Sequence, residues 1–155
     1  MSAGNDLKSI LGRISKDIQK QFNAKEMQKI GEFVVTEIKD RTRKGYGVSE
    51  LGGPEIALDS LSPDYVAKRR KSKLSPFTTP NKSNLTFSGR LLGGLRYKVR
   101  DGYARIEPSG KSRDGTPNIK IAEYVSEERP FMTLSKYQLG RLYEFIKKKI
   151  STITD

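Results

Sequence analysis

The stretch Tyr97-Lys98-Val99-Arg100-Asp101-Gly102-Tyr103-Ala104-Arg105-Ile106 carries the strongest fold signal in the chain. Two runs of alternating apolar and polar residues flank Asp101-Gly102. An Asp-Gly pair supplies the positive φ angles that a tight two-residue turn needs. The sequence therefore predicts an antiparallel hairpin over residues 97–106.

Apolar residues recur at helical spacing on both sides of this hairpin. Residues 6–40 predict one long interrupted helix or two helices, and the terminal part of this region is expected to act as an assembly arm. The last helix is predicted to start at Ser135, which follows a proline-containing segment. Its apolar face is predicted to contain Leu139, Leu142, Tyr143, Ile146 and Ile150.

The remaining segments complete an α+β prediction for a single domain over residues 1–155. A small antiparallel sheet packs with long N-terminal and C-terminal helices, and residues 41–61 and 107–118 form long polar loops. Residues 85–95 predict a short helix, whereas residues 119–125 fit a strand or a short helix equally well. The predicted core contains Leu91, Leu92, Val99, Ile106, Phe131, Leu139, Leu142 and Ile146.

Composition argues against catalysis. The 155 residues include no histidine and no cysteine. This excludes a Ser-His-Asp triad, a Cys-His pair, and metal sites built on imidazole or thiolate. No enzyme activity, cofactor or metal is expected. No apolar run approaches the ~20 residues that span a bilayer, and the first residues lack the apolar core of a signal peptide. We therefore expect a soluble protein made in the cytoplasm.

Positive charge is concentrated in the middle of the chain. The net charge is +12, and residues 41–120 contain 17 basic against 7 acidic side chains. A helix predicted from Pro63, with Ser62 as its N-cap, contains the densest basic run: Lys68, Arg69, Arg70, Lys71 and the nearby Lys73. Three interpretations remain open for this run: a solvated helix end, contact with DNA phosphates, or contact with an acidic protein surface.

The order of the segments resembles the virion-morphogenesis or tail-completion family of tailed bacteriophages, small neck proteins at the head–tail junction. The matching parts are Leu61-Ser62-Pro63-Asp64-Tyr65-Val66-Ala67-Lys68-Arg69-Arg70-Lys71, then Leu85-Thr86-Phe87-Ser88-Gly89-Arg90-Leu91, then Ala122-Glu123-Tyr124-Val125. The last is Arg129-Pro130-Phe131-Met132-Thr133-Leu134-Ser135 with its following helix. Together they cover roughly residues 5–150.

The resemblance implies a structural subunit that forms a ring around the DNA channel of the virion neck, made in the cytoplasm of a bacterial host. Its expected partners are copies of itself, a head-side adaptor or stopper protein, a tail-tube or tail-terminator protein, and double-stranded DNA. The alternative function is a stand-alone basic module that binds nucleic acid. The expected assembly interface contains Leu7, Ile10, Leu11, Ile14, Ile18, Arg129, Pro130 and Phe131.

Overall fold

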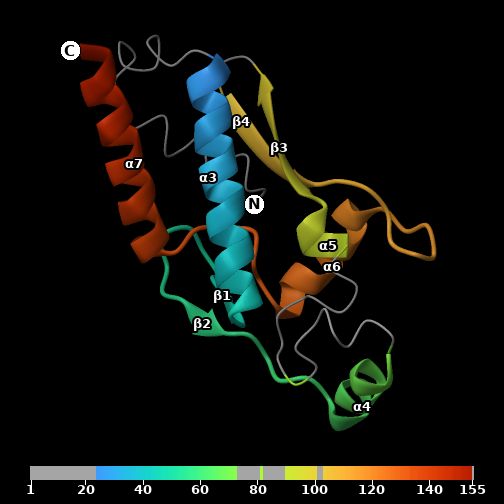
Figure 1. Cartoon of the computed structure of the whole chain (residues 1–155). Helices are drawn as coiled ribbons and strands as arrows, with labels where there is room; N and C mark the ends of the chain where they lie inside the picture. The colour runs from blue at the N-terminus through green and yellow to red at the C-terminus, as the bar shows by residue number, and fades with distance from the viewer. Residues whose placement is uncertain (1–23, 73–80, 82–89, 101–102, 155) are drawn as a thin grey trace.

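The computed structural model describes residues 24–72, 81, 90–100 and 103–154. They form helices and two small antiparallel pairs of strands, so the predicted α+β class is confirmed (Figure 1). None of the described helices is both long enough and apolar enough to cross a membrane. In chain order the elements are α3 (Ala24–Arg43), β1 (Tyr46–Gly47), β2 (Ile56–Ala57), α4 (Pro63–Lys71), α5 (Arg90–Gly93), β3 (Leu95–Arg100), β4 (Tyr103–Pro108), α6 (Asn118–Glu128) and α7 (Lys136–Thr154).

The predicted hairpin is present as β3 and β4. The register pairs Arg100 with Tyr103, whereas the predicted turn residues Asp101 and Gly102 between them lie outside the described residues. Alternate side chains point to opposite faces of a strand, and one face of this hairpin is apolar: Leu95, Ala104 and Ile106 are buried on it. The hairpin therefore has an inner face toward the core and an outer face toward solvent.

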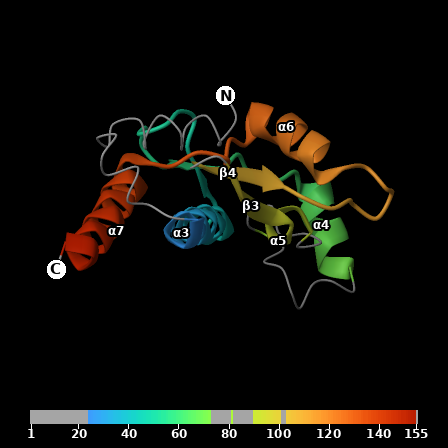
Figure 2. The ribbon, with the colours of Figure 1, turned by 90° about the horizontal axis from the view of Figure 1, so that it is seen from above.

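Helix α3 lies across the inner face of the hairpin and also contacts α7. Figure 2 looks along α3, with the hairpin on one side and α7 on the other. Gly31 faces the ring of Tyr97, where an added Cβ would lie 2.7 Å from Cγ. Glycine at this position thus allows the close approach of helix and strand. The buried apolar stripe of α3 contains Met27, Ile30, Val34, Val35 and Ile38.

The core lies between α3, the hairpin and α7, and it contains all eight residues predicted for it. Five are buried: Leu92, Ile106, Phe131, Leu142 and Ile146. The other three, Leu91, Val99 and Leu139, are half-buried against this cluster. The periodicity of the sequence was sufficient to identify them because each lies on a regular helix or strand, or on the segment that anchors α7.

The predicted apolar face of α7 is wrong at Tyr143, whose side chain is 66% exposed. The buried face of α7 is rotated toward Gln138, which is only 2% exposed and is held there by hydrogen bonds to α3. Sequence periodicity places a glutamine outside, so it centred the stripe on the wrong side. The side chain of Ile150 lies outside the described part of the chain.

Some segments predicted as loops contain regular structure. Within residues 41–61, α3 extends to Arg43 and a short antiparallel pair joins β1 to β2. Within residues 107–118, β4 continues to Pro108. Of residues 85–95, only α5 is helical among those described, and Leu95 already begins β3.

Residues 119–125, whose sequence fits a strand or a short helix equally well, lie within α6. Asn118 at its first position is buried, and its side-chain amide donates to the carbonyl oxygens of Ser109 at 2.7 Å and Arg90 at 3.2 Å. These bonds fix the start of α6 against α5 and the end of β4.

Candidate functional site

The residues of the basic run on α4 differ in exposure. Ser62 caps the helix, its hydroxyl accepting from the amide of Tyr65, and Pro63 occupies the first turn, as predicted. Lys68, Arg70 and Lys71 are exposed, so these three remain candidates for contact with a polyanion or an acidic protein. Lys73 lies outside the described residues.

Arg69 does not share that surface, and its assignment to a contact site is corrected. Its side chain is only 1% exposed, and its guanidinium carbon lies 5.9 Å from the ring centre of Tyr65. Burial lowers the pKa of Arg69, while Tyr65 acts in the opposite direction. Four consecutive residues fan around a helix, so at least one faces inward.

The expectation that Phe131 belongs to the assembly interface is likewise corrected, because its side chain is completely buried in the core of its own chain. Arg129 is half-buried beside Glu128, at 3.4 Å. Pro130 is half-buried, and its carbonyl oxygen accepts from the amide of Val48 at 3.0 Å. The segment thus attaches the residues before α7 to the β1 region. The other expected interface residues, Leu7, Ile10, Leu11, Ile14 and Ile18, lie outside the described residues.

The contact with Pro130 makes a prediction for Gly47. An added Cβ at this position would lie 2.2 Å from the Pro130 carbonyl oxygen and 2.7 Å from a methyl of Leu58. Gly47→Ala should therefore lower the free energy of unfolding by about 1–3 kcal/mol, the usual cost of overpacking. Gly140→Ala is the control, because no atom outside the local backbone of α7 lies within 4 Å of a Cβ there. Urea unfolding of both variants checks this, and equal stability of the two would contradict the contact.

Arg41, near the end of α3, is the centre of a buried polar network that the sequence analysis did not identify. Its side chain is 4% exposed. It donates to the carbonyl oxygen of Phe131 at 2.5 Å, to that of Thr133 at 2.6 Å, and to Oε1 of Gln138 at 2.6 Å. Burial lowers its pKa to about 10, although the carboxylates of Glu55 and Glu37 act in the opposite direction. Arg41 is therefore a buried cation at neutral pH.

The network continues onto the start of α7. Nε2 of Gln138 donates to the carbonyl oxygen of Glu37 at 2.7 Å. The backbone N–H of Gln138 donates to the hydroxyl of Ser135 at 3.1 Å. Ser135 in turn donates to Glu55 at 2.9 Å, and Arg141 pairs with Glu37 at 3.1 Å. Ser135, where the last helix was predicted to start, is thus the N-cap of α7, which begins at Lys136. Polar contacts as well as the core fix α7 to α3.

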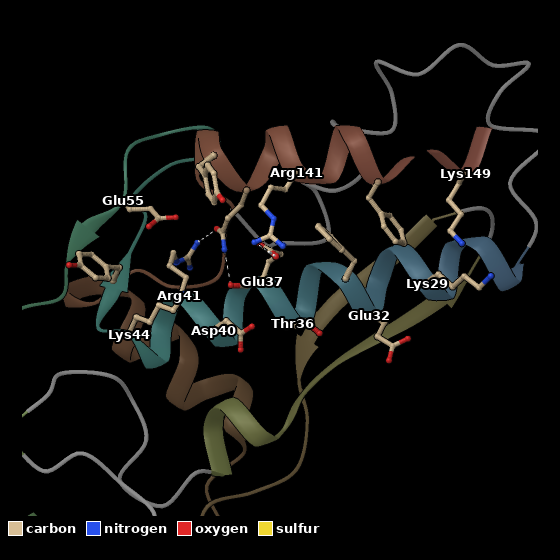
Figure 3. Close-up of a pocket in the computed structure, with 15 residues that line it drawn as sticks. Lys29, Glu32, Thr36, Glu37, Asp40, Arg41, Lys44, Glu55, Arg141 and Lys149 are labelled. Atoms are coloured by element: carbon tan, nitrogen blue, oxygen red, sulfur yellow. Dashed lines mark hydrogen bonds and ion pairs between the residues drawn. The ribbon is translucent and has the colours of Figure 1, made fainter. Parts of the chain in front are cut away.

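A groove of about 630 Å³ lies between α3 and α7, beside this network (Figure 3). The stacked rings of Phe33 and Phe145, whose centres are 4.8 Å apart, form its apolar part. The guanidinium of Arg141 lies 6.0 Å from the ring centre of Phe33 and 5.9 Å from that of Tyr137. Charged residues of both signs surround the rings: Lys29, Glu32, Asp40, Lys44, Glu55 and Lys149.

The groove combines an aromatic centre with a charged rim. An apolar aromatic centre with a charged rim is typical of protein–protein interfaces, where tyrosine and arginine are enriched. Within the described ranges, no group of three or more acidic side chains is placed to hold a metal ion.

Comparisons with protein-family models, with curated proteins and with solved structures find no match for this chain.

Proposed function

We propose that this protein is a structural neck or tail-completion subunit of a tailed phage, and that it forms a ring at the head–tail junction around the DNA channel. One observation carries the proposal: the groove between α3 and α7 has the make-up of a protein-docking surface. The resemblance of the segment order to the tail-completion family supplies the particular assembly.

A ring requires a surface on one copy that docks on a different surface of the next, with a rotation that closes. The groove offers one such surface on a rigid support, because α3 and α7 are fixed to each other by Arg41, Gln138 and the core. Tyr137 presents a ring that is 67% exposed at the groove. Tyrosine supplies large contact area at low entropic cost, so Tyr137 is the expected anchor of the interface.

Deleting the coding sequence from the phage or prophage that carries it should give DNA-filled heads and tails that are not joined, visible by electron microscopy. A plasmid copy of the gene should restore joined particles. Joined particles at the normal yield without the gene would overturn the proposal and would favour the alternative, a stand-alone module that binds nucleic acid.

The role of the groove is tested by complementation with two matched variants. Tyr137→Ser should reduce the yield of joined particles strongly, since truncating an interface anchor costs about 2 kcal/mol or more, roughly 30-fold in affinity. Tyr143→Ser is the control, because Tyr143 lies on the same helix, is 66% exposed and does not line the groove. Equal yields with both variants would contradict docking at the groove.

A further inference from the structure

The outer face of the β3–β4 hairpin is strongly basic. The register puts Arg96 opposite Glu107, Lys98 opposite Arg105, and Arg100 opposite Tyr103, all on this face. Arg96, Lys98, Arg100 and Arg105 are exposed. Among the outer side chains that the structure describes, four are cations and one, Glu107, is an anion.

This distribution of charge is not the one that best stabilises a hairpin. Like charges directly opposite each other on neighbouring strands are destabilising, yet Lys98 faces Arg105. Glu107 contacts both, pairing with Lys98 and lying 3.5 Å from Arg105. One carboxylate is therefore shared between two cations, and the face retains a clear positive excess.

The positive region extends beyond the hairpin toward the end of α3. Burial, followed by the charges of Arg96 and Arg43, lowers the pKa of Lys39. Lys39 therefore lies close enough to Arg96 for the two charges to interact, which adds a cation to the positive field around Arg96 and raises the local attraction for a polyanion.

We infer that the outer face of the β3–β4 hairpin binds the phosphate backbone of double-stranded DNA, without reading its sequence. The inference deepens the proposed function, on which its biological setting rests, by naming the surface that faces the channel. In a ring, each copy would present one such hairpin to the same DNA molecule.

Two features favour DNA over an acidic protein. The centre of a protein interface is depleted of charge and enriched in apolar and aromatic anchors, whereas DNA-binding surfaces are polar and strongly positive. The described outer side chains of the hairpin are charged and mostly positive, so they resemble a DNA-binding surface. The geometry also fits, since alternate residues on a strand are about 7 Å apart, which spreads the cations along the ribbon so that they can neutralise several phosphates at once.

The test measures binding of the purified full-length chain to a fluorescein-labelled duplex of mixed sequence by anisotropy, from ~50 to ~200 mM salt. Lys98→Gln/Arg105→Gln should weaken binding and reduce the slope of log K against log salt by about 2, roughly one for each cation that no longer neutralises a phosphate. Both side chains are more than half exposed. Their variant should keep the wild-type urea midpoint, so an effect on binding does not report misfolding.

The matched comparison is Lys68→Gln/Lys71→Gln on α4, which changes the net charge equally at two exposed positions. The inference expects this variant to retain the wild-type slope. It is overturned if both variants lose the same affinity, since net charge alone would then account for binding, or if only the α4 variant loses it. It is also overturned if the hairpin variant keeps its DNA affinity but no longer joins heads to tails, because the face would then contact an acidic protein.

The two proposals fail in different measurements. Loss of DNA binding by the hairpin pair with normal joining after gene deletion would reject the neck role and leave the DNA surface in place. Unjoined particles after deletion with unchanged DNA binding by the hairpin pair would reject the DNA surface and leave the neck role in place.

Discussion

Arg41→Met should lower the free energy of unfolding by about 3–5 kcal/mol, because it leaves buried acceptors without a donor. Arg41 satisfies the carbonyl oxygens of Phe131 and Thr133 and the side-chain oxygen of Gln138 at once. Methionine fills much of the same volume but donates nothing. Arg41→Lys should recover only part of the loss, since an ammonium cannot reproduce the planar fork of a guanidinium.

Arg43→Met is the matched control for Arg41. It removes a guanidinium from the same helix, but Arg43 is about half exposed and its ion pair with Asp40 spans 3.9 Å. The control should change stability by no more than about 0.5–1 kcal/mol. Urea unfolding followed by circular dichroism measures all three variants. If Arg41→Met were as stable as Arg43→Met, the buried network would have no net stabilising role.

The effect of Arg41→Met should not depend on pH between about 6 and 9. The pKa of Arg41 is lowered by burial to about 10, below its value in the unfolded chain. The unfolded chain therefore binds more protons only above about pH 10, where the cost of burying the charge is progressively relieved and stability rises. Below that pH both states are protonated, so the difference between the variant and the wild type stays constant.

Phe131→Ala should cost about 3–5 kcal/mol, the range for removing a buried aromatic ring. Its side chain is 0% exposed and belongs to the core between α3, the hairpin and α7. Met132→Ala, at the neighbouring half-buried position, should cost clearly less. Phe131→Leu should recover part of the stability, since it refills most of the cavity.

The same variant separates the two roles that the sequence suggested for Phe131. If Phe131 is a core residue, Phe131→Ala should lower the stability of the isolated chain, which its urea midpoint measures. An interface residue would instead leave the isolated chain stable and abolish only assembly. Unchanged stability of Phe131→Ala would therefore contradict the burial of this ring in the core.

The hairpin and the core were predictable because each depends on local rules. Asp101-Gly102 specifies a tight turn by its backbone preferences, and the alternation around it sets the inner face. Apart from Phe131, which lies on the segment before α7, the predicted core residues follow helical or strand periodicity, so their burial did not require knowledge of the rest of the fold.

The candidate site was not predictable in the same way, because it depends on contacts between distant segments. Arg41 and Gln138 are polar, and burial statistics place such residues outside. They are buried because each satisfies the other, 97 positions apart. The rotation of α7 away from Tyr143 has the same cause.

The basic outer face of the hairpin was within reach of sequence reasoning. Lys98 and Arg100 alternate with the inward residues of β3 inside the predicted hairpin, and Arg96 continues the row because β3 begins at Leu95. The predicted contact site was instead the consecutive run on α4, although a helix distributes consecutive residues around its axis. A period of two in a strand places charges on one face, and a run of four in a helix does not.

The hydrogen bonds of Arg41 span 90 to 97 positions along the chain. During synthesis, α3 leaves the ribosome before Phe131 and Gln138 are translated, so Arg41 has none of these acceptors until the start of α7 has been made. Contacts closed over such long separations form late. A nascent chain that stops short of α7 would therefore leave the buried guanidinium of Arg41 without its acceptors, so such incomplete copies would be more open to chaperones and proteases.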